Sequence, residues 1–122
     1  MPQKHRDPQN FLPLKPDVFT ILLVLLEGER HGYAIMKASA RRRGGRGHLQ
    51  PGALYRLLKQ MLDSGLVKEL DRRRVPGSED QRRRYYAITR LGTRVAAAEA
   101  RRMSELVRLS RRYNLLEEGE AP

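Results

Sequence analysis

The sequence predicts a mainly α-helical fold with one small β-hairpin and a long helix at its C-terminal end. Apolar residues recur at helical spacing in four segments, which is the pattern of four helices with buried faces. Two short segments of alternating side chains follow the third helix and predict the strands of the hairpin. Glycine or proline stands at most junctions between the segments. A chain of 122 residues has room for one such domain and a long terminal element.

The chain is strongly basic. It carries 25 Lys and Arg against 14 Asp and Glu, a formal net charge of +11. A charge of this size attracts polyanions, of which nucleic acid is the first candidate and an anionic membrane surface the second. The chain has no cysteine, which excludes disulfides and thiolate metal sites and is compatible with the cytoplasm, where we expect the protein. The longest apolar run, residues 21–26, is too short to cross a bilayer, so no membrane partner is expected.

Residues 1–13 are predicted to be a flexible N-terminal arm. The first helix is expected over residues 18–27, with Asp17 as its cap and Gly28 as its end. This helix is apolar on nearly every side, so it needs partners on more than one face. In a small chain, that favours a domain core on one face and a second subunit on another. A second helix is predicted over residues 32–42 and ends in a basic, glycine-rich loop.

The third helix is predicted over residues 51–64, because proline is favoured at a first helical position and Gly65 ends it. Its two faces differ in chemistry. Apolar residues fall at core spacing on one face, namely Leu54, Leu57, Leu58, Met61 and Leu62. The opposite face carries two cations, a phenol and a glycine, namely Gly52, Tyr55, Arg56 and Lys59.

The hairpin is predicted from strands at residues 66–70 and 82–88, joined by a polar loop with arginine triplets at both of its ends. Thr89 is a suitable cap for a last helix over residues 90–114. This helix has an apolar stripe that would be exposed in isolation, so a partner is expected. Residues 115–122 are predicted to be a disordered acidic tail.

The predicted order is helix, helix, helix, hairpin, helix, which is a helix-turn-helix with a wing. Residues 14–89 would then form a winged-helix DNA-binding domain, and residues 90–114 a dimerisation helix. The third helix would enter the major groove of duplex DNA, and the wing would meet the flanking backbone or the minor groove. The predicted DNA-binding residues are Tyr33, Pro51, Gly52, Tyr55, Arg56, Lys59, Arg72, Arg73, Arg74, Arg82, Arg83 and Arg84. The predicted homodimer interface comprises Phe19, Leu22, Leu23, Leu26, Val95, Glu99, Met103, Leu106, Ser110 and Tyr113.

The chain resembles the PadR-like transcriptional regulators over about residues 14–112. The matching segments are residues 22–28, 31–35, 51–58, 65–67 and 83–92. The resemblance implies a winged-helix domain with a dimerising C-terminal helix, usually in a repressor, and a DNA-facing role for Tyr55. The single C-terminal helix is similar to that of the shorter members. Gln50 departs from the small hydroxyl residue usual before the third helix, and Gln is a poorer cap.

Two other kinds of function remain open from the sequence. An RNA-binding or ribosome-associated protein would share the basic charge and the RGG-like stretch at residues 41–46. A protein-interaction module would use the charge for solubility. No nucleophile–base–acid set is present, so we do not expect an enzyme, and no spacing of His5, His31 and His48 suggests a metal site. We expect no cofactor. A small-molecule effector is possible, but the sequence does not identify one. Some PadR-like proteins bind aromatic drugs against a tryptophan, and we do not expect that pocket here because the chain has no tryptophan.

Overall fold

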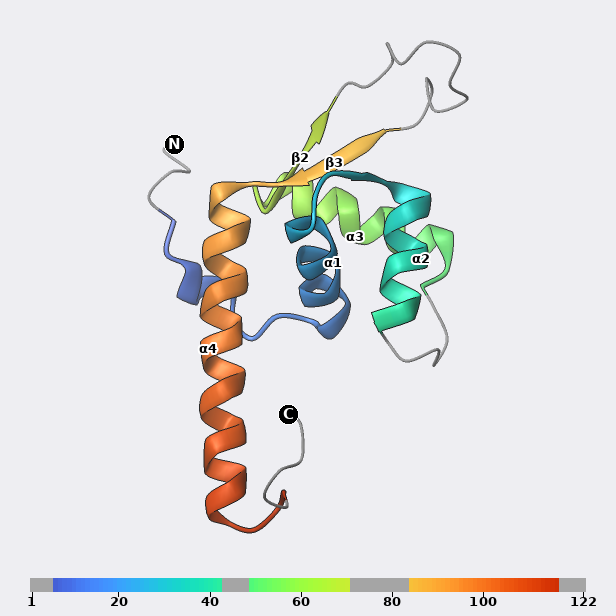
Figure 1. Ribbon diagram of the computed structural model, residues 1–122. Helices are drawn as coiled ribbons and strands as arrows, with labels where there is room; N and C mark the ends of the chain where they lie inside the picture. The colour runs from blue at the N-terminus through green and yellow to red at the C-terminus, as the bar shows by residue number, and fades with distance from the viewer. Residues whose placement is uncertain (1–5, 43–48, 71–83, 117–122) are drawn as a thin grey trace.

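The computed structural model describes residues 6–42, 49–70 and 84–116. Within these ranges the elements follow one another in the order η2 (Pro8–Phe11), α1 (Pro16–Leu26), β1 (Arg30–His31), α2 (Gly32–Arg42), α3 (Pro51–Asp63), β2 (Val67–Leu70), β3 (Tyr85–Ile88) and α4 (Arg90–Arg112). Figure 1 shows α1, α2 and α3 on one side of α4, whose C-terminal half extends beyond them. The predicted mainly α-helical fold with a small antiparallel sheet is confirmed.

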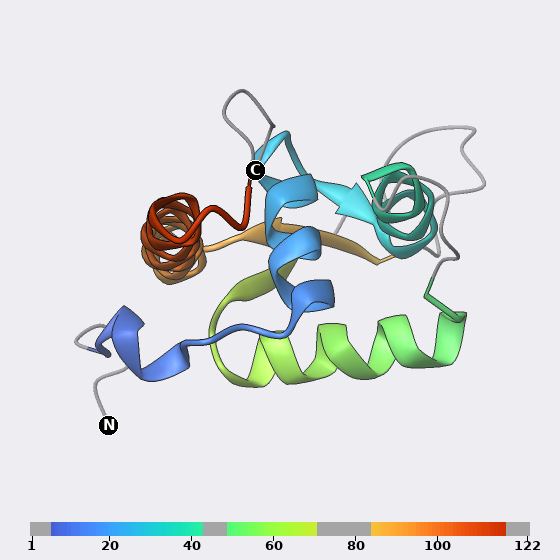
Figure 2. The ribbon, with the colours of Figure 1, turned by 90° about the horizontal axis from the view of Figure 1, so that it is seen from below.

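Helix α1 forms the centre of the domain, with α4 on one side of it and α2 on the other (Figure 2). Ile21, Leu22 and Val24 have 0% of their surface exposed, as expected for a helix that packs on several sides. Asp17 is not the cap that the sequence predicted. Lys15 is at the N-cap position and makes no side-chain capping bond, while Pro16 begins the helix, because proline has no N–H to satisfy there.

The sheet has three strands in the order β1–β3–β2, all antiparallel, so it is more than the predicted hairpin. The added strand, β1, has only two residues, and Arg30 lies opposite Tyr86 and His31 opposite Tyr85. It connects α1 to α2, and it therefore fixes the start of α2 to the sheet. A segment of two residues has no period of its own, so periodicity could not predict it.

The sequence predicted a loose arm over residues 1–13, but residues 6–13 and the following Leu14 are packed on the domain. The short 3₁₀ helix η2 packs against α4, and Phe11, Leu12 and Leu14 pack against the core. Arg6 donates a hydrogen bond from its guanidinium to the carbonyl oxygen of Ser64 at the end of α3. These three apolar side chains explain why the segment is ordered, because burying them stabilises a segment whose backbone makes few hydrogen bonds. Residues 1–5 of the predicted arm lie outside the described residues.

Three residues of the predicted dimer interface are buried within the chain itself. Leu22 and Val95 are 0% exposed and Glu99 is 1% exposed, so none of them has surface left for a second subunit. They fill the contact between α1 and the N-terminal half of α4. Helical periodicity identifies a buried face but does not say which element covers it, and here that element is the chain's own α1.

Glu99 is an ionisable group inside this contact. Arg102 donates two hydrogen bonds to it, from Nε to Oε1 at 2.6 Å and from Nη2 to Oε2 at 2.9 Å. The backbone N–H of Leu14 donates to Oε2 at 3.3 Å, so this one carboxylate ties the N-terminal segment to α4. The hydrogen bonds from Arg102 hold the pKa of Glu99 below its usual value of 4.5, although burial acts in the opposite direction.

Replacing Glu99 by alanine is expected to lower the free energy of unfolding by roughly 1–3 kcal/mol, because the Leu14 N–H and the Arg102 guanidinium lose a buried acceptor. The contribution of the native carboxylate has a defined pH window. Its folded pKa is lowered, so the stabilisation is present above pH 4.5 and is lost as the pH falls below that value. Urea unfolding at pH 7 and at pH 4 measures both effects.

The matched control for Glu99 is Glu105→Gln on the same helix. Glu105 also pairs with an arginine three residues on, Arg108, but both side chains are more than half exposed. An exposed pair contributes little to stability, so this variant should keep nearly the native urea midpoint. Equal losses in the two variants would contradict the role given to Glu99.

Candidate nucleic-acid interface

One face of α3 packs on the core and the other is open. Leu54, Leu58 and Met61 are buried, at 1%, 1% and 2% exposure. The residues that the sequence placed on the opposite face are all exposed, namely Gly52, Tyr55, Arg56 and Lys59, and so is Pro51 at the start of the helix. The predicted helix bounds differ from the observed ones by one residue, because Ser64 is the C-cap. Gln50 is at the N-cap position and makes no side-chain capping bond.

Tyr55 is half exposed and is held against the start of α2. A methyl group placed on Gly32 would overlap the Tyr55 hydroxyl and would lie 2.7 Å from the ring carbon Cζ. The absence of a side chain at Gly32 is therefore what lets the Tyr55 ring lie across the first turn of α2. This contact joins the two helices of the helix-turn-helix and fixes the direction of the phenol on the open face of α3.

His31 connects the start of α2 to the sheet, and sequence reasoning missed it. Its Nδ1 accepts a hydrogen bond from the backbone N–H of Ala34 at 3.2 Å, as a helix cap does. Its ring stacks on Tyr33 at 6.5 Å between centroids and meets the edge of Tyr85 at 5.4 Å. The position of His31 directly before a helix that begins with glycine could have indicated the capping role. Its contact with Tyr85 could not be predicted in this way, because Tyr85 is more than 50 residues away in the sequence.

Two further tyrosines differ in their surroundings. Tyr33 is 51% exposed, and the Lys37 ammonium lies 5.3 Å from the centre of its ring, so a cation and an aromatic face meet at the open side of α2. Tyr86 is 3% exposed and belongs to the core. Burial raises the pKa of the Tyr86 phenol, and the nearby Glu69 carboxylate raises it further. Tyr33 and Tyr55 are therefore the exposed aromatic groups at the two helix starts.

The predicted wing is described only at its base. Arg84 is exposed, and its Nε lies 3.3 Å from Oε2 of Glu69 on the neighbouring strand. The other arginines predicted to meet DNA, Arg72, Arg73, Arg74, Arg82 and Arg83, lie outside the described residues. Strands β2 and β3 lie side by side and run away from the helices in Figure 1.

Positive charge on the open face of α3 is partly balanced. Lys59 forms an ion pair with Asp63 at 3.4 Å, in which both side chains are mostly exposed. Such a pair is weak in water, so the ammonium can exchange this partner for another anion. Arg56 borders a hollow of about 580 Å³ between α3 and the start of α1.

The described part of the chain holds no group of three His, Asp or Glu residues suited to a metal ion. None of its helices is both long enough and apolar enough to span a membrane.

A helix-turn-helix whose second helix has an open basic face, followed by a β-hairpin, defines a winged-helix protein. The chain belongs to the PadR-like family of transcriptional regulators, whose family model matches residues 21–98. Members of this family are regulators of transcription rather than enzymes.

Solved structures agree with this fold. A PadR family transcription regulator from Clostridium difficile has a TM-score of 0.66 and 21% identity, over 81% of this chain and 98% of its own. A transcriptional regulator from Clostridium thermocellum has a TM-score of 0.65 and 20% identity, over 86% and 91%. Bacillus subtilis PadR, solved with operator DNA, has a TM-score of 0.58 and 19% identity, over 90% of this chain and 51% of its own. No curated protein matches the chain in sequence.

Proposed function

We propose that the protein represses transcription by binding a near-palindromic operator in duplex DNA as a homodimer. The observation that carries the proposal is the open face of α3, where Tyr55 is held in place by its contact with Gly32 and lies beside Arg56 and Lys59. An α-helix fits the major groove of B-form DNA, and this face of the helix-turn-helix offers cations and a phenol to it.

The side chains divide between two tasks. Lys59 and the exposed Arg84 at the base of the wing are suited to bind phosphate oxygens of the DNA backbone. Such contacts position the protein on the duplex but do not distinguish one base sequence from another. Tyr55 and Arg56 lie nearer the start of α3, the part of a recognition helix that reaches base edges, and we assign base contact to them. Bacillus subtilis PadR was solved with operator DNA, which supports the same use of this fold here.

The test is to pass genomic fragments of the source organism over the protein at physiological salt and to sequence those that it retains. The expected result is a small set of promoter fragments that share an inverted repeat, with half-sites about one helical turn apart. Affinity for them should fall steeply as salt rises, because arginines and lysines displace counterions. Retention without a shared repeat, or displacement of the fragments by structured RNA at equal concentration, would overturn the proposal.

The homodimer is supported by apolar surface that the chain leaves uncovered. Met103 and Leu106 on the extended half of α4 are 38% and 49% exposed, and Tyr113 at its C-cap is 71% exposed. Leu23 and Leu26 on α1 are 36% and 47% exposed. A hollow of about 670 Å³ lies where Phe19 of α1 meets Met103 and Val107 of α4. Exposed apolar side chains on α1 and α4 beside such a hollow are typical of an interface. Of the residues predicted for this interface, Leu22, Val95 and Glu99 are buried within the chain and are not part of the proposal.

Replacing Met103 and Leu106 together by glutamate is expected to convert the dimer into a monomer, because the change puts two charges into an apolar interface. Sedimentation equilibrium should give twice the chain mass of 14.1 kDa for the native protein and 14.1 kDa for the variant. Ala97→Glu is the control, because Ala97 is exposed on a different side of α4 and its substitution should leave the dimer intact. A native protein that sediments as a monomer would disprove the dimer.

A further inference from the structure

A row of arginines runs along one side of α4. Residues 90, 94, 101, 108 and 112 are separated by four, seven, seven and four positions, which places them on the same face of an α-helix. All five are exposed, and we refer to them as the arginine face of α4. The buried residues of α4 lie on the opposite side of the helix, and they include Val95, Ala96 and Glu99. At 1.5 Å per residue, the face is about 33 Å long.

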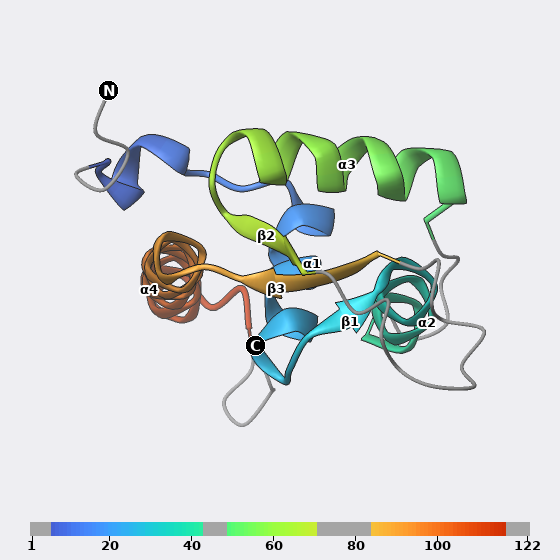
Figure 3. The same ribbon diagram turned by 90° about the horizontal axis from the view of Figure 1, so that it is seen from above.

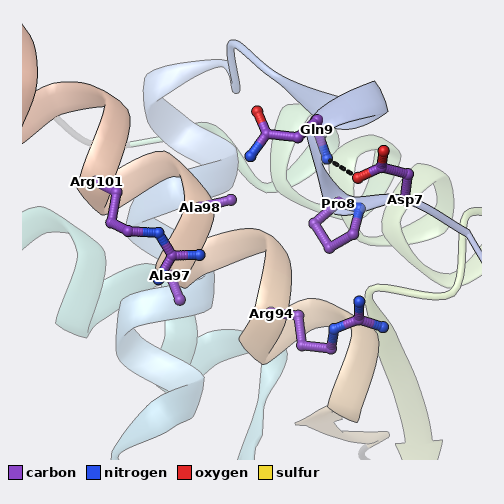
Figure 4. Close-up of a pocket in the computed structure, with 7 residues that line it drawn as sticks. All are labelled: Asp7, Pro8, Gln9, Arg94, Ala97, Ala98 and Arg101. Carbon is purple, nitrogen blue, oxygen red and sulfur yellow. Dashed lines mark hydrogen bonds between the residues drawn. The ribbon is translucent and has the colours of Figure 1, made fainter.

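Most of this charge is not balanced by the residues that the structure describes. Arg108 pairs with Glu105 and also borders the hollow between Phe19 and Met103 that we propose for the dimer interface, so the proposal rests on the other members of the row. Arg94 and Arg101 form no hydrogen bond or ion pair with any residue that the structure describes. Figure 4 shows the two guanidiniums on the same side of α4, with Ala97 between them and Pro8 and Gln9 of η2 across from them. They border a hollow of about 400 Å³ that Asp7 also lines, and the Asp7 carboxylate accepts the backbone N–H of Gln9 at 2.9 Å. The hollow has room for an anionic group beside the two guanidiniums.

The arginine face is remote from the open face of α3. Figure 3 shows α4 at one end of the molecule and α2 at the other, with the N-terminal end of α3 beside α2. Gly52, Tyr55 and Arg56 are at that N-terminal end. One straight duplex that fills the open face of α3 would not lie along α4 of the same subunit. The arginine face is therefore available to a different polyanion while α3 is occupied.

We propose that the arginine face of α4 binds the phosphate backbone of a second DNA duplex, so that the protein bridges two DNA segments. Duplex DNA presents about one negative charge per 1.7 Å of its axis, so a basic row about 33 Å long faces a continuous line of phosphates. Guanidinium groups bind phosphate oxygens with paired N–H donors, and the hollow between Arg94 and Arg101 leaves space for a phosphate between two of them. With neither an aromatic side chain nor an amide in the row, the binding is independent of sequence.

The first experiment measures DNA binding with the open face of α3 disabled, so it does not depend on the proposed operator. The background variant is Tyr55→Ala, Arg56→Ala and Lys59→Ala, and the probe is a random-sequence duplex. Adding Arg94→Gln and Arg101→Gln should reduce the slope of log affinity against log salt by about 2, since each phosphate that is no longer neutralised accounts for about 0.9. Arg94→Lys with Arg101→Lys keeps the charge and should restore most of the slope. A slope that the glutamine changes leave unaltered would overturn the proposal.

The second experiment measures bridging with α3 intact. An immobilised duplex holding a retained genomic fragment is loaded with protein, and capture of a labelled random duplex is recorded. The native protein should capture it, whereas the Arg94→Gln and Arg101→Gln variant should hold the first duplex and lose the second. Equal capture by both proteins would overturn the proposal, as would stronger capture of a structured RNA than of the DNA. If the protein never binds the first duplex, the operator proposal fails. The salt-slope experiment still tests the bridging proposal in that case, because it does not depend on the operator.

Discussion

Replacing Tyr55, Arg56 and Lys59 together by alanine is expected to weaken operator binding roughly 100-fold, since each base-edge or phosphate contact contributes about 1 kcal/mol or more. All three side chains are exposed, and alanine favours the helix, so the fold should persist with an unchanged helical spectrum. Fluorescence anisotropy with a labelled operator, measured at several salt concentrations, gives the loss. The single change Lys59→Ala should weaken all sequences alike, whereas Arg56→Ala should also relax the preference for the operator.

The charge-matched control is Arg94→Gln with Arg101→Gln, which also removes two cations. These residues lie on α4, at the opposite end of the molecule from the N-terminal end of α3 (Figure 3). Salt screens charges over a Debye length of about 8 Å, so operator affinity should stay within about threefold of native. If this control weakens operator binding as much as the α3 variant, net charge rather than the α3 face determines affinity. Retention of operator affinity by the folded α3 variant would show that another element reads the operator.

The sequence predicted the helices well because each has a dense apolar pattern. Helix α3 alternates core and open positions over more than three turns, so both its bounds and its open face followed from periodicity. Thr89 was predicted as the cap of α4, and its hydroxyl does accept the N–H of Gly92 at 2.9 Å. These are local features, in which the residues that interact lie within four positions of one another.

The features that the sequence did not predict depend on contacts between distant residues. Strand β1 exists because His31 pairs with Tyr85, and η2 is ordered because it meets α4. The contact of Tyr55 with Gly32 spans two helices and a loop. Glu99 and Met103 are four positions apart on α4, and the sequence predicted both for the dimer interface. Helix α1 covers only the N-terminal half of α4, so Glu99 is buried and Met103 is exposed. Which element covers a face is decided by topology rather than by local pattern.

Gly92→Ala is expected to lower the free energy of unfolding by about 3 kcal/mol or more, although alanine is the better helix former. Gly92 is in the first turn of α4, where that helix packs closely against the backbone of Leu66, directly before β2. An added methyl group would overlap the carbonyl oxygen of Leu66 and lie 2.8 Å from Cγ1 of Ile88. The carbonyl is backbone, so it cannot rotate away, and it already accepts the N–H of Thr89 at 3.1 Å. Relief of the overlap therefore requires α4 to move away from the sheet.

Gly52→Ala is the control that separates this contact from helix propensity. Gly52 is in the first turn of α3, and an added methyl group there meets nothing within 4 Å. Propensity alone predicts that both variants gain stability, by about 0.5–1 kcal/mol. The structure instead predicts opposite signs, a gain at Gly52 and a loss at Gly92. Thermal unfolding at one protomer concentration tests this, because dimerisation makes the midpoint depend on concentration. A gain in both variants would mean that α4 does not approach Leu66 this closely.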